Sequence, residues 1–196
     1  MNRIFIYLCS AFFLLSCWEE KYFVPKPRQY PRIDFPDRHY MDFEAGECPL
    51  LFHYPSYATV KKTVSFFEED PIHPCWFDIE FGPFNGQLHC SYYTIGGLKD
   101  FDVLIDDAFK FAGKHDIKAH YRRESIISNE AGLGGILFEI DGPVASPLQF
   151  FVTDSVQHFF RASLYFRSKV NPDSMAPVHA FINDDVLEMI RSFRFK

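Results

Sequence analysis

The spacing of apolar residues predicts strands along most of the chain after residue 50. Apolar and polar positions alternate from Phe77 to Phe81 and again over 88–94, as they do in half-buried strands. Asn85-Gly86 lies between these two segments and is typical of a hairpin turn. Further strands are expected at 51–54, 58–60, 117–127, 136–140, 148–153 and 158–166.

Two other segments repeat apolar residues every three or four positions, which is the pattern of an amphipathic helix. The first ends near Gly113, a residue suited to stop it, and the second begins near Asp173 or Ser174, which can cap it. The apolar face of the first helix is formed by Leu98, Phe101, Ile105, Ala108 and Ala112. That of the second helix is formed by Val178, Phe181, Ile182, Val186, Met189, Ile190 and Phe193.

This order of strands and helices predicts an α+β fold. Short turns join successive strands, so we expect an antiparallel β-sheet meander that is covered by two main helices, packed on one face. Residues 48–196 are long enough for a single domain with a core of its own.

The N-terminus carries the signature of an exported lipoprotein. An apolar run of 12 residues, from Ile4 to Leu15, follows one basic residue, Arg3. The run is shorter than the ~20 residues of a membrane-spanning helix, but it suits an export signal. It closes in Leu14-Leu15-Ser16-Cys17, which resembles a bacterial lipobox. We therefore predict a lipoprotein signal peptide at 1–16 and lipidation of Cys17, with a plain secretory signal as the alternative.

Residues 17–47 are rich in proline, and basic residues alternate there with aromatic ones. Each proline fixes its own φ and pushes the preceding residue to extended geometry, which disfavours a helix or a central strand. We predict an extended tether that holds the domain away from the membrane. The alternative is a docking strip that wraps the domain or meets a partner.

Charge and composition limit the classes of partner. With 26 acidic residues against 20 Lys and Arg, the net charge is −6, which argues against binding of nucleic acid. Aromatic residues make up 18% of the chain, as suits the core of a sheet. After Cys17 we find no segment that predicts a membrane span, so attachment would depend on the lipid, and two acyl chains suffice.

Three cysteines would remain in the domain after export, in an oxidising compartment. Three thiols allow one disulfide and one free cysteine. Cys48 and Cys75 each precede a predicted strand, whereas Cys90 lies within one and would behave as a small buried apolar residue. We therefore predict a disulfide between Cys48 and Cys75.

The histidines and glycines predict no metal or nucleotide site. His73-Pro74-Cys75 and His89-Cys90 bring imidazole near sulfur, but both lack the paired ligand spacing of zinc sites. The glycines at 132–135 precede a strand instead of a helix N-terminus, so they predict a turn or bulge. We expect neither a metal nor a cofactor.

Acidic and hydroxyl residues also predict no catalytic site. Asp154-Ser155 with His158 lacks a nucleophile elbow and is typical of a turn between strands. Asp106-Asp107 and Asp184-Asp185 are adjacent on helices, where their side chains diverge by about 100 degrees. We expect these carboxylates to be solvated, and the chain to be no enzyme.

Several sequence strings resemble the gliding motility lipoprotein GldD family. In the first half they are Val24-Pro25-Lys26-Pro27-Arg28, Cys48-Pro49 with Phe52-His53-Tyr54-Pro55, and the segments 75–81 and 88–92. In the second half they are the segments 145–155 and 158–161. The likeness covers essentially the whole mature chain.

This resemblance implies a cell-envelope lipoprotein of Bacteroidota-type bacteria that is needed for gliding and is linked to the type IX protein secretion machinery. Its partners would be other motility or secretion proteins of the envelope. The resemblance brings no catalytic residues. It also implies an apolar residue where Cys90 stands, which favours the pairing of Cys48 with Cys75.

Other functions and locations remain open from the sequence. A periplasmic ligand-binding or chaperone-like lipoprotein would hold a peptide, glycan or lipid on the aromatic sheet, and a wide apolar pocket would favour it. A hydrolase has no motif in its support. We expect the anchored domain to face the periplasm. Exposure on the outer-membrane surface is the alternative, since Glu19-Glu20-Lys21 weakly resembles a surface-export signal.

Overall fold

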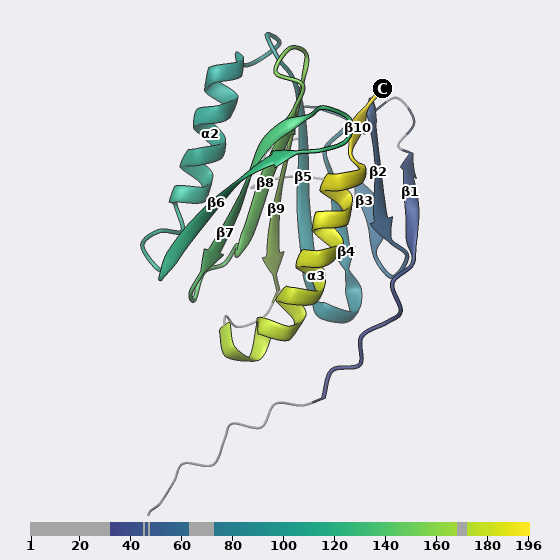
Figure 1. Ribbon diagram of the computed structural model, residues 1–196, viewed down its shortest axis with the longest axis vertical. Coiled ribbons are helices and arrows are strands. Elements are labelled where there is room, and N and C mark those ends of the chain that lie inside the picture. Colours follow the sequence, from purple (N-terminus) through teal and green to yellow (C-terminus); the bar gives the residue numbers. More distant parts are fainter. Residues whose placement is uncertain (1–31, 45, 47, 63–72, 168–171) are drawn as a thin grey trace, which may run out of the picture. The chain divides into compact units, whose positions relative to one another are not determined.

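The computed structural model describes residues 32–44, 46, 48–62, 73–167 and 172–196 (Figure 1). Residues 34–196 form one compact unit. The predicted signal peptide, Cys17 and residues 17–31 of the predicted tether lie outside the described residues, so these assignments stay predictions.

Within the described residues, seven strands form one antiparallel sheet in the order β3-β4-β5-β9-β8-β7-β6 (Figure 1). After β5 the chain passes through α2 to the far edge, and β6 to β9 return step by step until β9 pairs with β5. The strands are β3 (Thr59–Lys62), β4 (Phe77–Phe81), β5 (Gly86–Thr94), β6 (Tyr121–Ser128), β7 (Gly134–Asp141), β8 (Leu148–Thr153) and β9 (His158–Phe166). The 3-10 helix η1 (Gly82–Phe84) links β4 to β5, and α2 is Phe101–Gly113.

A second sheet of the described chain has the order β1-β2-β10, with β1 (Tyr40–Glu44), β2 (Leu50–Pro55) and β10 (Arg194–Phe195). Because β1 pairs with β2, the folded part begins before residue 48, within the range predicted as tether. The stretch between Pro36 and Pro49 has no proline, so its backbone groups are available for an edge strand.

The helices α2 and α3 (Pro172–Ser192) lie on opposite faces of the large sheet, so the prediction that both pack on one face is wrong (Figure 1). Phe159 stacks on Phe151 in the cluster that α2 covers, with ring centroids 5.1 Å apart. The next residue, Phe160, contacts Phe193 just after α3 at 4.7 Å. Consecutive strand residues point to opposite faces, so both faces of β9 are covered.

Many element boundaries agree with the pattern of the sequence. Strands β8 and β9 have the predicted limits, and β4 shows the predicted alternation of buried Phe77, Ile79 and Phe81. The predicted hairpin forms, since β4 pairs with β5, but its turn is η1 and not the Asn85-Gly86 pair. Asn85 ends η1 in a left-handed conformation with φ 52°, and Gly86 is the first residue of β5.

Two elements are shorter than predicted, and the excluded residues are exposed. Leu98 lies before α2 with 74% of its surface exposed, and Ile117 lies before β6 with 91% exposed. The buried face of α2 is formed by Leu104, Ala108 and Ala112. None of the helices in the described ranges is long and apolar enough to cross a membrane.

Candidate functional site

The structure joins Cys48 and Cys75 by a disulfide with Cα atoms 5.5 Å apart, which is the pairing predicted from the sequence. Cys48 leads into β2 of the small sheet and Cys75 into β4 of the large sheet, so the bond links the entries to both sheets. Cys90 is free and buried in β5. Burial raises the pKa of its thiol, so the reactive thiolate is disfavoured.

Asp154, Ser155 and His158 do not form a catalytic triad. The carboxylate of Asp154 accepts backbone N–H bonds from residues 156, 157 and 158 at 2.8–3.0 Å. Burial raises the pKa of Asp154, but these donors outweigh it and hold the pKa below its usual value. His158 is instead paired through Nδ1 with the hydroxyl of Tyr92 at 2.6 Å. The segment is a turn, as predicted.

The glycines near β7 serve backbone packing. A Cβ at Gly135 would collide with the carbonyl oxygen of Phe151 on β8, so only glycine fits there. Gly132 has φ +76° in a turn where Asn129 Oδ1 accepts the N–H groups of Ala131 and Leu133. Among the described residues, no group of three His, Cys, Asp or Glu side chains could hold a metal ion.

A buried carboxylate on α3 gathers groups from distant segments, and we call this set the Asp185 clip. The hydroxyls of Tyr40 and Tyr57 donate to Asp185 at 2.8 and 2.5 Å. Arg38 Nε lies 3.3 Å from the same carboxylate, and another guanidinium nitrogen donates to exposed Asp184 at 2.8 Å. The prediction that both aspartates are solvated is therefore wrong for Asp185, because its partners lie more than 120 residues away.

The carboxylate of Asp185 has charged and hydrogen-bonding partners on both of its oxygens. Burial and the neighbouring carboxylate raise the pKa of Tyr40 to about 12 and raise that of Tyr57 further, so both phenols stay protonated donors. Phe35 stacks on Phe181 of α3 at 4.5 Å, beside Arg38. The segment that leads into β1 is thereby fixed along α3.

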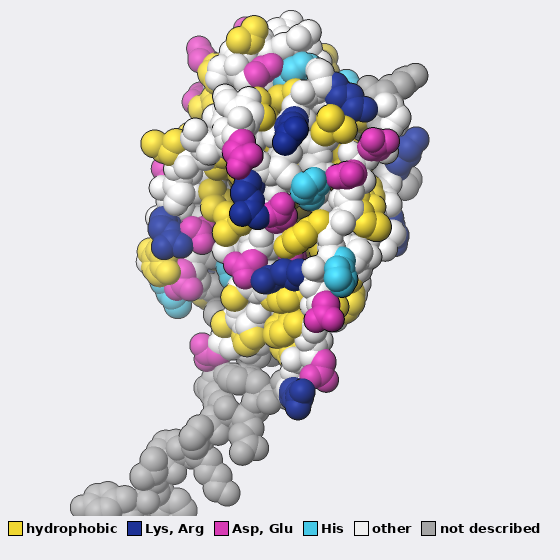
Figure 2. Space-filling model, turned by 45° about the vertical axis from the view of Figure 1, so that its right-hand side comes forward, with side chains coloured by type: hydrophobic (Ala, Val, Ile, Leu, Met, Phe, Trp, Pro, Cys, Tyr) yellow, Lys and Arg dark blue, Asp and Glu magenta, His cyan; other side chains and the backbone are white. Residues whose placement is uncertain are grey.

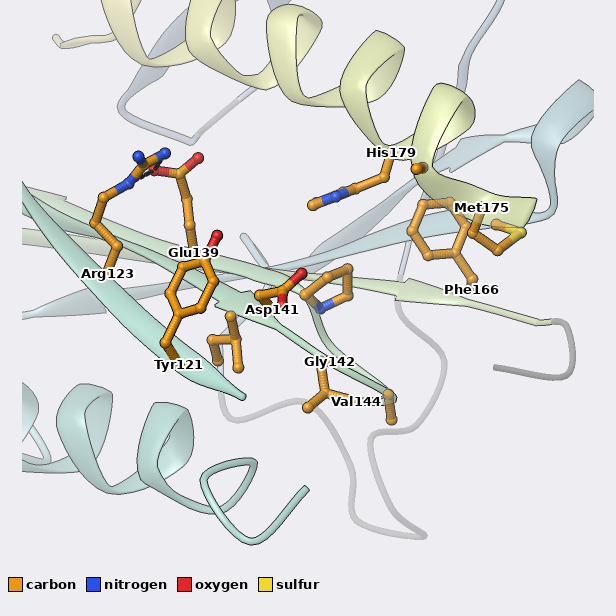
Figure 3. Close-up of a pocket in the computed structure, with 13 residues that line it drawn as sticks. Tyr121, Arg123, Glu139, Asp141, Gly142, Val144, Phe166, Met175 and His179 are labelled. Atoms are coloured by element: carbon orange, nitrogen blue, oxygen red, sulfur yellow. Dashed lines mark hydrogen bonds and ion pairs between the residues drawn. The ribbon is translucent and has the colours of Figure 1, made fainter. Parts of the chain in front are cut away.

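A pocket of about 230 Å³ lies nearer the N-terminal end of α3, between this helix and strands β6 and β7 (Figure 3). We call it the α3 pocket. Its polar lining comprises Tyr121 and Arg123 of β6, Glu139 and Asp141 of β7, and His179 of α3. Its other side chains are mainly apolar and include Val144, Pro147, Phe166 and Met175.

The imidazole of His179 is the unusual group of this pocket. Figure 3 shows it pointing from α3 toward the side of Glu139 and Asp141. Its Nε2 atom is buried without a hydrogen-bond partner among the described residues. Burial lowers the pKa of His179 in spite of the two carboxylates, so the ring is neutral near pH 7. Buried polar atoms without partners are rare in native proteins.

The charged groups of the pocket are unevenly paired. Arg123 Nε donates to Glu139 at 2.8 Å, and a second guanidinium nitrogen lies 2.7 Å from the same oxygen. Asp141 contacts His120 Nδ1 at 3.2 Å at the exposed rim. The described lining therefore holds two carboxylates against one guanidinium.

Sequence reasoning did not single out the residues of the α3 pocket. They come from four segments that only the fold brings together, namely β6, β7 with the loop after it, the end of β9, and α3. A weak signal was present, since Tyr121 and Arg123, like Glu139 and Asp141, occupy alternate positions of their strands and so share a face.

A wider hollow of about 1010 Å³ lies between β1 and β4. Its lining includes Asp42, Glu44, Lys62 and His73 beside aromatic residues, so it is not the wide apolar pocket that a lipid carrier would need. Figure 2 shows acidic and basic side chains interspersed over one face of the molecule, without a block of one sign there.

Comparison with known proteins links the chain to one family. The family model described as gliding motility lipoprotein GldD matches residues 20–195. A comparison with curated proteins finds no match. The solution structure of cyanobacterial PsbP (CyanoP) from Synechocystis sp. PCC 6803 is similar with a TM-score of 0.46 and 11% identity, over 85% of this chain and 98% of that chain. This likeness is too distant to inform fold or function.

Proposed function

Since the chain belongs to the gliding motility lipoprotein GldD family, we propose that it is a non-enzymatic envelope component that acts through protein contacts and is linked to the type IX secretion machinery. The family itself accounts for a lipoprotein role in gliding motility. The link to secretion and the contacts with other envelope proteins are the parts that go further.

The extent of the family match is the observation that carries this proposal. It begins three residues after Cys17 and runs to residue 195, so it includes all but the last residue of the unit 34–196. Among the side chains weighed as catalytic candidates, Asp154, His158 and Asp185 have structural partners. These observations favour a role in assembly over chemistry.

Attachment would combine a lipid on Cys17 with a fixed position at which the predicted tether joins the domain. A chain that runs from Cys17 to Asp34 reaches at most about 60 Å when fully extended. The Asp185 clip then holds the following residues along α3. The anchored domain would thus move within a limited distance of the membrane, facing the periplasm.

Deletion of the gene tests the function. We expect the deletion to stop surface movement and to reduce the release of proteins secreted by the type IX pathway, both restored by the wild-type gene. Intact movement and intact secretion in the deletion strain would contradict the proposal. Intact secretion alone would contradict the link to the secretion machinery.

Cell fractionation tests the anchor. Replacement of Cys17 by Ser should release the protein from the membrane fraction, because no acyl chain is attached. Cys90→Ser is the matched control, since this free thiol is buried in β5 and should leave membrane association unchanged. A Cys17→Ser protein that stays in membranes would contradict the lipid anchor.

Protease added to intact cells tests the orientation. A domain that faces the periplasm should be cleaved only after the outer membrane is opened. Cleavage in intact cells would show that the domain is exposed on the surface.

A further inference from the structure

We propose that the α3 pocket is a binding site for a small amine with an apolar body, whose ammonium group lies between His179, Glu139 and Asp141. The apolar body would lie against Phe166, Met175 and neighbouring side chains. This site goes beyond the envelope role proposed above.

The unpaired nitrogen of His179 calls for a ligand with a hydrogen-bond donor. A neutral imidazole has one nitrogen that donates and one that accepts. Nε2 is buried as the ring stands, so the imidazole has to turn slightly to meet a ligand group. That group also faces the carboxylates of Glu139 and Asp141, which repel an acceptor and attract a donor. The tautomer with an accepting Nε2 is therefore the one that the site uses.

The charge of the pocket favours a cation over an anion. Glu139 engages Arg123 through both Nε and a terminal nitrogen, so this guanidinium is already neutralised. The side chain of Asp141 is half exposed and contacts the exposed imidazole of His120. An ammonium group would find negative charge at this end of the pocket. A phosphate or carboxylate would find Arg123 already bound.

The size and walls of the pocket suit an apolar group of modest size. An apolar cavity of about 150 Å³ is sufficient for benzene. At about 230 Å³, the α3 pocket has room for an aromatic ring with a short amine-bearing arm. Met175 is unbranched and adapts to ligands of different shape.

Water is the simplest other occupant of the site. A polar cavity of this size holds water, and a water molecule could donate to Nε2 after the same small turn of the ring. A pocket that only holds water would show no preference among small solutes with different head groups. This difference decides the experiment.

The experiment is an NMR titration of the mature chain from residue 17, with Cys17→Ser to keep it free of lipid. The probes are 2-phenylethylamine, 2-phenylethanol and phenylacetate, which share a ring and differ in charge. We expect amide shifts around β7 and the first turns of α3, with the amine bound at least about tenfold more tightly than the other two, as a charge-assisted hydrogen bond implies.

Variants make the assignment specific. Asp141→Asn and His179→Leu should each weaken amine binding by about tenfold, for the loss of one charged or hydrogen-bonded partner. Asp116→Asn is the matched control, because its side chain is 49% exposed against 48% for Asp141 but lies outside the pocket lining. Ala176→Trp, at an exposed lining position, should block all three probes without loss of the fold.

Two results would overturn the proposal. Equal affinities for the three probes would show that the head group is not recognised. Absence of shifts at the pocket, with the protein folded and the probes in excess, would show that the cavity holds only water.

Discussion

Two polar groups on α3, His179 and Asp185, are six residues apart and have opposite surroundings. Asp185 is buried and receives two phenol hydroxyls and a guanidinium from other segments. His179 has a buried Nε2 without a partner in the described chain, beside a cavity. The helix rise places the two about 9 Å apart along the axis.

The difference distinguishes Asp185, a polar group with a structural role, from His179, whose Nε2 would gain a partner only when a ligand binds. A buried charge that is fully hydrogen-bonded specifies a single arrangement of the chain, and removal of a partner leaves the others unsatisfied. A buried polar atom without a partner lowers stability and has no structural benefit of its own. Natural proteins retain such groups at functional sites.

Replacement of Asp185 should give the largest effect. Asp185→Asn removes the charge that Arg38, Tyr40 and Tyr57 share, so we expect the free energy of unfolding to fall by about 3–5 kcal/mol. Urea unfolding followed by circular dichroism measures this. Asp184→Asn is the control, because Asp184 is exposed and its pair with Arg38 contributes about 1 kcal/mol or less. Equal losses of unfolding free energy in the two variants would contradict the distinction between buried Asp185 and exposed Asp184.

Two tyrosines sharpen the comparison. Tyr57→Phe deletes a hydroxyl that donates to the buried carboxylate, which should cost about 1.5–3 kcal/mol. Tyr121→Phe changes a phenol of the pocket rim that is 60% exposed, so unfolding should shift by about 0.5 kcal/mol or less. Thermal or urea unfolding of both proteins tests this, and a larger loss for Tyr121→Phe would contradict it.

His179→Leu should act in the opposite direction. The variant removes the unpaired nitrogen and retains an apolar side chain, so we expect stability to rise by about 1 kcal/mol. His120→Leu serves as control on the exposed side of the pocket and should change little. A marked loss of stability in His179→Leu would show that the imidazole has a structural partner.

The contributions of His179 and of the Asp185 clip to the free energy of unfolding should change at opposite ends of the pH scale. Burial lowers the pKa of His73, His115 and His179 below that of the unfolded chain. The unfolded state then binds more protons than the folded state. The stability that these neutral histidines contribute is therefore fully present above pH ~6.5 and is lost as the pH falls. His179→Leu should make this acid loss shallower in unfolding curves measured at a series of pH values, and an unchanged slope would contradict the assignment.

The clip should weaken only in alkali. The pKa of Tyr40, raised to about 12, exceeds that of the unfolded chain, near ~10. Its contribution is therefore present below pH ~10 and is lost as the pH rises toward 12. Tyr40→Phe should reduce the pH dependence of unfolding in this window, and a steeper dependence would contradict the sign.

The sequence predicts the fold well where one local pattern dominates. Residues 148–153 and 158–166 form strands with the predicted limits, because apolar runs bounded by turn residues fix both ends. The coverage of both sheet faces was missed, although consecutive Phe159 and Phe160 are what a sheet buried on both sides requires. The sequence does not predict β1, because the prolines on either side of it are typical of an extended tether.

The candidate sites were harder to predict, because their residues meet only in the folded chain. Asp185 looks like half of a solvated acidic pair until β1 brings Tyr40, and the turn between β2 and β3 brings Tyr57, beside it. His179 lies next to the apolar stripe of α3, and nothing local shows that Nε2 lacks a partner. The disulfide between Cys48 and Cys75 could be predicted from the sequence, because only three cysteines follow Cys17 and these two each precede a strand.

Stabilisation by 2-phenylethylamine in three proteins tests the central claim most directly, namely that one of these polar groups on α3 is structural and the other meets a ligand. At a hundredfold excess over its dissociation constant, the amine should raise the free energy of unfolding of the wild type by about 2.7 kcal/mol. The same gain should appear in Asp185→Asn, whereas the tenfold weaker binding of His179→Leu should reduce it to about 1.4 kcal/mol at that concentration. A gain that is lost in Asp185→Asn and kept in His179→Leu would contradict the account.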